Sequence, residues 1–116
     1  MQIKLSKNNI FFGANWSKYL QNQFDDLERA IIKSQDFHEI GLFRAKKKII
    51  NDCFQHGTIY NTATLDNSVL KNSYYLKVND RTIHITSIPQ SATKKLNMFV
   101  INKIATKLSK ISRTRG

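Results

Sequence analysis

Side chains that can transfer protons and hold phosphate lie close together in the stretch YYLKVNDRTIHIT, residues 74–86. Asn79 and Asp80 at its centre are typical of a two-residue β-hairpin turn, and such a turn fixes which residues lie opposite each other on the two strands. One side of the predicted hairpin is mostly aliphatic and belongs against the core; it pairs Val78 with Arg81, Leu76 with Ile83 and Tyr74 with Ile85. The other side is polar throughout; it pairs Lys77 with Thr82, Tyr75 with His84 and Ser73 with Thr86.

The polar side of this hairpin carries the groups that RNA cleavage through the 2′-hydroxyl requires, namely a base, an acid and a fixed cation. His84 would act as the acid or the base, Tyr75 as a proton donor or a base-stacking platform, and Lys77 as the electrostatic clamp on the phosphorane. This chemistry needs no metal and no other cofactor. Antiparallel sheets also expose polar faces that have no function, and that alternative stays open.

Positive charge is concentrated near the end of the chain. The sequence has 19 Lys and Arg against 8 Asp and Glu, a net charge of +11, and residues 91–116 contribute +7 of it without a single acidic side chain. Such asymmetry favours a polyanionic partner, with nucleic acid first and an anionic membrane surface second, or else a solvated basic tail. The longest uninterrupted apolar run, MFVI at 98–101, is too short to span a bilayer, so we expect a soluble, cytoplasmic protein without a membrane partner.

The last predicted helix places an aromatic residue within a basic stripe. Phe99 projects among lysines opposite the apolar side of that helix, which suits phosphate binding with the ring stacked on a base. It equally suits a protein partner with Phe99 as the anchor, or simple packing of the ring on a loop. The candidate nucleic-acid-binding residues are Lys95, Phe99, Lys103, Lys107, Lys110, Arg113 and Arg115, with Arg44 and Lys48 from an earlier helix.

Apolar spacing predicts three amphipathic helices. The first has Asn15 as its N-cap and buries Trp16, Leu20, Phe24, Leu27 and Ile31. The second runs from about residue 39 to about residue 55 and ends at Gly57 in a left-handed cap. Its apolar set is Leu42, Phe43, Ile49, Ile50, Cys53 and Phe54. The third starts at Ser91 and buries Leu96, Val100, Ile101, Ile104, Leu108 and Ile111.

Alternating patterns predict the strands. QIKLS at 2–6 could form a first strand, which FF at 11–12 could extend or replace, whereas 61–70 is polar and irregular enough to be partly loop. Three antiparallel strands are expected at 58–64, 73–78 and 81–88, and Pro89 closes the last of them. The predicted class is α+β: an N-terminal strand and two helices, a three-stranded antiparallel meander and a C-terminal basic amphipathic helix. We expect a single domain over residues 1–116, with 112–116 frayed.

Cysteine and histidine usage does not favour a metal site or a catalytic thiol. The single cysteine, Cys53, lies in an apolar helical setting that predicts a buried, reduced thiol. His38, His56 and His84 lack metal-ligand spacing.

The order of elements, with the hairpin SYYLKVNDRTIHI after a helical pair, resembles that of small RelE/ParE-type toxins. It also resembles the broader group of metal-independent RNases that includes barnase-like and colicin-D-like folds. The resemblance covers most of the chain as topology and does not extend to a motif. It implies catalytic His, Lys, Arg or Tyr residues on the exposed sheet and nearby helices, where Tyr75, Lys77 and His84 would lie. A RelE-like hairpin is richer in arginine, whereas Arg81 here falls on the core side near the turn.

Three hypotheses follow. The first is a small basic RNA-binding protein, extended to a toxin-like, metal-independent endoribonuclease acting from the exposed sheet face. The second is a non-catalytic nucleic-acid-binding or ribosome-associated accessory protein. The third is a basic inhibitor or interaction protein whose basic helix docks on an acidic protein partner. Under the first hypothesis the acidic partner would be an antitoxin.

Overall fold

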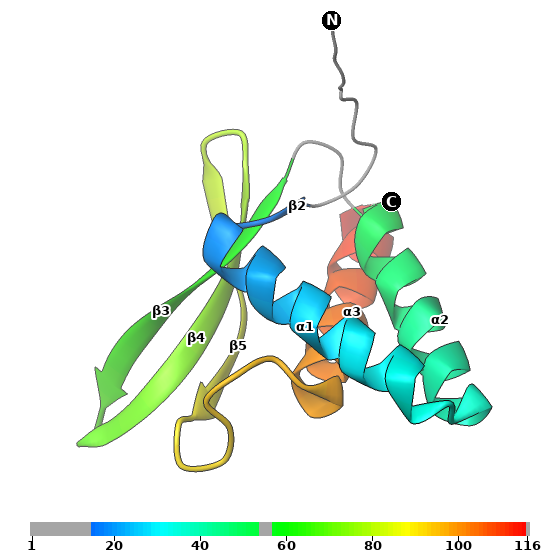
Figure 1. Cartoon of the computed structure of the whole chain (residues 1–116). Helices are drawn as coiled ribbons and strands as arrows, with labels where there is room; N and C mark the ends of the chain where they lie inside the picture. The colour runs from blue at the N-terminus through cyan, green and yellow to red at the C-terminus, as the bar shows by residue number, and fades with distance from the viewer. Residues whose placement is uncertain (1–14, 54–56, 116) are drawn as a thin grey trace, which may run out of the picture.

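The computed structural model describes residues 15–53 and 57–115, which form three helices and one sheet (Figure 1). In chain order the elements are β2 (Asn15–Trp16), α1 (Lys18–Ser34), α2 (Phe37–Cys53), β3 (Thr58–Asp66), β4 (Val69–Val78), β5 (Arg81–Pro89) and α3 (Met98–Arg115). The predicted α+β class is confirmed. The expected first strand, at 2–6 or 11–12, lies outside the described residues. So do residue 116 and the side chains of 112–115, and the frayed end stays a prediction.

All three helices lie on one side of the sheet (Figure 1). Helices α1 and α3 contact the sheet, and α2 packs against α3 and α1. The described strands follow the order β2-β3-β4-β5, with β2 parallel to β3 and the other neighbours antiparallel. The predicted three-stranded meander is therefore confirmed. Within the described sheet β5 is an edge strand, and one sheet face has no helix over it.

One cluster of buried apolar side chains fills the space between the sheet and the helices. The ring of Trp16 stacks on Phe24 with centroids 5.0 Å apart, and Phe24 meets Phe43 of α2 at 5.2 Å. The apolar positions predicted for α1 and α3 are buried or half-buried, whereas Leu42 of α2 is 41% exposed. The buried set is Leu20, Phe24, Ile31, Phe43, Ile50, Ile59, Tyr74, Leu76, Ile85, Ile88, Leu96, Val100, Ile101, Ile104, Ala105 and Leu108.

The first two helices begin at residues other than those predicted. Ser17, and not Asn15, caps α1, because its side-chain oxygen accepts the backbone N–H three residues further on at 3.3 Å. Asn15 is instead held extended in β2, where it pairs with β3. Asp36 accepts the N–H of Glu39 at 3.1 Å, so α2 begins about two residues earlier than predicted.

The third helix begins at Met98 and not at Ser91. Asn97 caps it, since its side-chain oxygen accepts a backbone N–H of the first turn at 3.0 Å. The preceding segment is attached to α1, because the N–H of Leu96 donates to the side-chain oxygen of Gln23 at 2.9 Å. This tertiary contact holds residue 96 against α1, outside the helix.

Residues 61–70, predicted as partly loop, form the two-residue turn of the β3–β4 hairpin and the adjoining parts of both strands. The turn consists of Asn67 and Ser68, whose φ angles of 49° and 65° are the left-handed values that a two-residue type I′ loop needs. Glycine usually marks such a turn, and this turn contains none. The long hairpin carries β3 and β4 well beyond the helices (Figure 1).

The β4–β5 hairpin follows the predicted register only near its turn. The pairs Val78–Arg81, Lys77–Thr82, Leu76–Ile83 and Tyr75–His84 are as predicted. Beyond them the register shifts, so Tyr74 pairs with Thr86 and Ser73 with Ser87; the predicted Tyr74–Ile85 and Ser73–Thr86 pairs are wrong. Ile85 is the extra residue of a β-bulge, which reverses the faces of the residues that follow it.

Gly57 has a different role from the predicted one. It is not left-handed, because no glycine in the described part has a positive φ. Gly57 is buried against β4, where a Cβ would lie 2.8 Å from Leu76 Cδ1 and 3.1 Å from Val78 Cγ2. The side chain of Cys53 and residues 54–56 lie outside the described part, so the buried thiol also stays a prediction.

Candidate nucleic-acid interface

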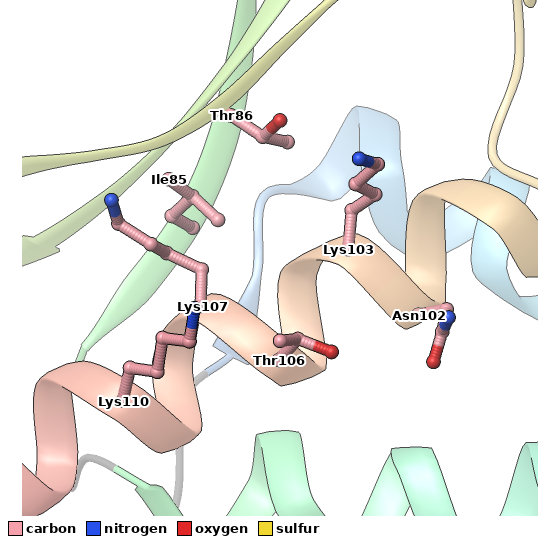
Figure 2. Close-up of a pocket in the computed structure, with 7 residues that line it drawn as sticks. All are labelled: Ile85, Thr86, Asn102, Lys103, Thr106, Lys107 and Lys110. Carbon is pink, nitrogen blue, oxygen red and sulfur yellow. The ribbon is translucent and has the colours of Figure 1, made fainter.

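A groove of about 350 Å³ lies between the edge strand β5 and helix α3 (Figure 2). In Figure 2 the side chains of Lys103 and Lys107 extend from α3 towards β5, and those of Ile85 and Thr86 project from β5 towards the helix. The lining residues are Ile85, Thr86, Asn102, Lys103, Thr106, Lys107 and Lys110. The bulge makes this geometry possible, because it places the Thr86 side chain on the groove side of β5 instead of on the open sheet face predicted for it.

Helical periodicity places the three lysines of the groove on one side of α3. Lys103, Lys107 and Lys110 are spaced by four and three residues and are all exposed, while the opposite side of the helix is buried in the core. The described ion pairs are Arg29–Asp26, Lys47–Glu28, Lys48–Asp52 and Lys71–Asp66. No lysine of α3 takes part in them. The groove is therefore lined by positive charge without acidic compensation.

Phe99 lies beside this groove and is 55% exposed. The Nζ atom of Lys103 lies 5.3 Å from the centroid of the Phe99 ring, a cation–π distance. The predicted exposed aromatic within a basic stripe is thus present, and Lys103 joins the ring to the groove. A flat apolar surface next to lysines can stack on a base while the cations contact phosphates.

The second candidate region is the open face of the sheet. Tyr75 and His84 are direct cross-strand partners with ring centroids 5.4 Å apart in an edge-to-face arrangement. His84 and Lys77 are exposed and Tyr75 is half-buried. The three residues predicted to be catalytic therefore lie on one solvent-facing surface.

A chain of hydroxyl groups crosses the three strands and ends at His84. The Thr64 and Ser73 hydroxyl oxygens lie 2.8 Å apart, those of Ser73 and Ser87 lie 2.7 Å apart, and Ser87 Oγ lies 2.8 Å from His84 Nε2. Ser73 is buried although it is polar, and these bonds satisfy it. Because a hydroxyl can donate or accept, each serine of the chain can bond to both of its neighbours.

Tyr60 is a member of this face that the sequence interpretation missed. Its ring lies nearly parallel to that of Tyr75, at an interplanar angle of 23° and a centroid distance of 5.5 Å. The pairing could have been predicted from the turn at Asn67 and Ser68, because that turn places residue 60 opposite residue 75. The polar character of residues 61–70 hid the turn.

Other predicted binding residues lie away from the groove. Lys95 is exposed in the segment before α3, where its carbonyl accepts the hydroxyl of Thr93. Arg44 and Lys48 line a different cavity, between α1 and α2, and Lys48 forms an ion pair with Asp52 at 3.0 Å. The remaining two, Arg113 and Arg115, belong to the end of α3, and their side chains lie outside the described part.

Within residues 15–53 and 57–115, no group of three or more His, Cys, Asp and Glu side chains is placed to hold a metal ion. The same residues contain no helix that is both long enough and apolar enough to cross a bilayer. Comparison of the chain with protein-family models, with curated proteins and with solved structures found no significant match.

Proposed function

We propose that this chain is a small RNA-binding protein that holds phosphates in the groove between α3 and β5. The observation that carries the proposal is the set of Lys103, Lys107 and Lys110 around that groove without an acidic partner. Lysine ammonium groups bind phosphate as point charges, and the Thr86 hydroxyl adds a donor of the kind found at phosphate contacts. The net charge of +11 would speed encounter with any polyanion.

A titration of labelled RNA at several salt concentrations tests this proposal. Binding that weakens linearly in a plot of log affinity against log salt is expected, because each phosphate contact releases counterions. A DNA strand of the same sequence serves as the comparison. Absence of RNA binding near physiological salt would contradict the proposal and would favour an acidic protein partner for the basic helix.

A second candidate function is metal-independent endoribonuclease activity on the open sheet face. The observation that favours it is the exposed His84 ring, which contacts the Ser87 hydroxyl and the Tyr75 ring, with Lys77 on the same face. His84 would exchange protons with the 2′-hydroxyl and the leaving oxygen, and Lys77 would stabilise the developing negative charge. The order of elements that resembles RelE/ParE-type toxins motivates the same candidate.

Incubation of the protein with tRNA and with total RNA in the presence of a chelator tests this second candidate. Fragments with 2′,3′-cyclic phosphate ends would support it, because this chemistry uses the RNA's own hydroxyl as nucleophile. Intact RNA together with salt-dependent binding would leave a binding protein without nuclease activity.

A further inference from the structure

Three rings form a row across the open face of the sheet, one from each strand of the meander. Tyr60 of β3 lies 5.5 Å from Tyr75 of β4, and Tyr75 lies 5.4 Å from His84 of β5, measured between ring centroids. Both tyrosines are half-buried and His84 is exposed. The neighbouring residues Ile59 and Leu76 are buried on the opposite face, and in the described part of the chain all helices lie on that buried side of the sheet (Figure 1).

The surroundings of the row are polar and positively charged. Thr62, Ser73 and Thr82 place hydroxyl groups on the same face, so the rings form a narrow aromatic strip among hydrogen-bonding groups. Lys77 follows Tyr75 on that face, and none of the described ion pairs includes it. A ligand that joins a planar ring to a negatively charged group therefore matches this surface, because the ring can stack on the aromatic row and the charge can contact Lys77.

The row ends at His84 on the open side of β5, and the lysine groove lies on the other side of the same strand. His84 points to the open face, whereas Thr86, two residues further on, lines the groove because of the bulge at Ile85. A ligand contacting both sides must bend around the edge of the sheet. An RNA duplex is stiff and its bases are paired inside the helix, whereas a single strand can bend and present its bases for stacking.

We propose that the row of Tyr60, Tyr75 and His84 is a stacking site for unpaired nucleobases, so that the RNA bound by this protein is single-stranded and contacted on both sides of β5. This inference rests on the proposed RNA-binding function and adds the class of RNA. Lys77 contacts the phosphate next to a stacked base, while Lys103, Lys107 and Lys110 hold the continuing backbone in the groove.

The test measures the affinity of wild type and variants for three probes: a single-stranded RNA of about ten nucleotides, the matching duplex, and a single strand of the same length without bases. Tyr60→Ala removes one ring of the row and is expected to weaken binding of the single-stranded RNA about fivefold or more, with little effect on the other two probes. Tyr60→Phe keeps the ring and should bind like wild type. Leu65→Ala changes an exposed side chain of the same strand near the hairpin turn, away from the row, and it is the matched control.

The outcomes separate this inference from the proposed function. Tight binding of the duplex, or unchanged binding by Tyr60→Ala, would overturn the stacking site while leaving an RNA-binding groove. If wild type binds no RNA, both proposals fall. Should Tyr60→Ala unfold, nuclear magnetic resonance of wild type gives a second measurement. The site is supported if the ring-proton chemical shifts of Tyr60 and His84 change on addition of single-stranded RNA and not on addition of the base-free strand. Unchanged chemical shifts contradict it.

Discussion

His84 Nε2 lies 2.8 Å from Ser87 Oγ, although residues three apart on a regular strand point to opposite faces. The bulge at Ile85 makes the contact possible, since it brings Ser87 onto the face of His84 and sends Thr86 into the groove beside α3. One irregular residue thus shapes both candidate regions.

Replacement of His84 tests the second candidate function. We expect His84→Ala to lower any metal-independent RNA cleavage, measured at saturating protein, at least about a hundredfold, because the proton-transfer group is lost. His38→Ala is the matched control, because His38 is exposed on α2, away from the sheet. Cleavage that persists in His84→Ala would exclude His84 from the chemistry.

Lysine substitutions in the groove test the phosphate contacts. Lys103→Ala and Lys107→Ala should each weaken RNA binding and reduce the slope of log affinity against log salt by about 0.7, because each lysine neutralises one phosphate of a single strand. Lys33→Ala removes an exposed lysine of α1, outside the groove, and should leave the slope unchanged. Equal effects of all three substitutions would mean that net charge alone drives binding.

Two glycines give opposite predictions for stability. Gly57→Ala should lower the free energy of unfolding by about 1–3 kcal/mol, because the new methyl group would lie 2.8 Å from Leu76 Cδ1. Gly41→Ala should raise it by about 0.5–1 kcal/mol, because the site is within α2 and the added Cβ would meet no heavy atom within 4 Å other than its chain neighbours and the adjacent helix backbone. Urea denaturation measures both. Unchanged stability of Gly57→Ala would contradict this and show that the Leu76 side chain moves aside at little cost.

The burial of the Tyr74 phenol leads us to expect a lower free energy of unfolding at alkaline pH. Burial raises the pKa of its phenol above the ordinary value of 10.0, and the nearby Tyr19 adds to the rise. The unfolded chain therefore loses this proton at lower pH than the folded chain does, so stability is complete below about pH 10 and falls as the pH rises further. Tyr74→Phe should reduce that fall in denaturation curves recorded on both sides of pH 10. If the free energy of unfolding falls equally with rising pH in wild type and in Tyr74→Phe, Tyr74 does not cause the fall.

The features that could be predicted from the sequence are those set by local residue patterns. Asn79 and Asp80 mark the β4–β5 turn, and the turn placed Tyr75 opposite His84 correctly. The bulge also leaves a signal in the sequence, because the apolar spacing changes from two to three residues between Ile85 and Ile88, both of which are buried. The missed β3–β4 turn lacks the usual glycine.

Tertiary contacts decided the remaining differences. The parallel pairing of β2 with β3 moved the cap of α1 from Asn15 to Ser17. The bond from Leu96 to Gln23 holds the segment before α3 in place and accompanies its late start. The groove itself depends on how α3 lies against β5, and a single element's sequence does not contain that information.

The most direct test of the central claim is a nuclear magnetic resonance titration of the protein with a short single-stranded RNA. We expect the largest backbone shifts at Thr86 and around Lys103 and Lys107, next to the groove. Shifts confined to the α1–α2 surface near Arg44 and Lys48, or no shifts at all, would contradict it.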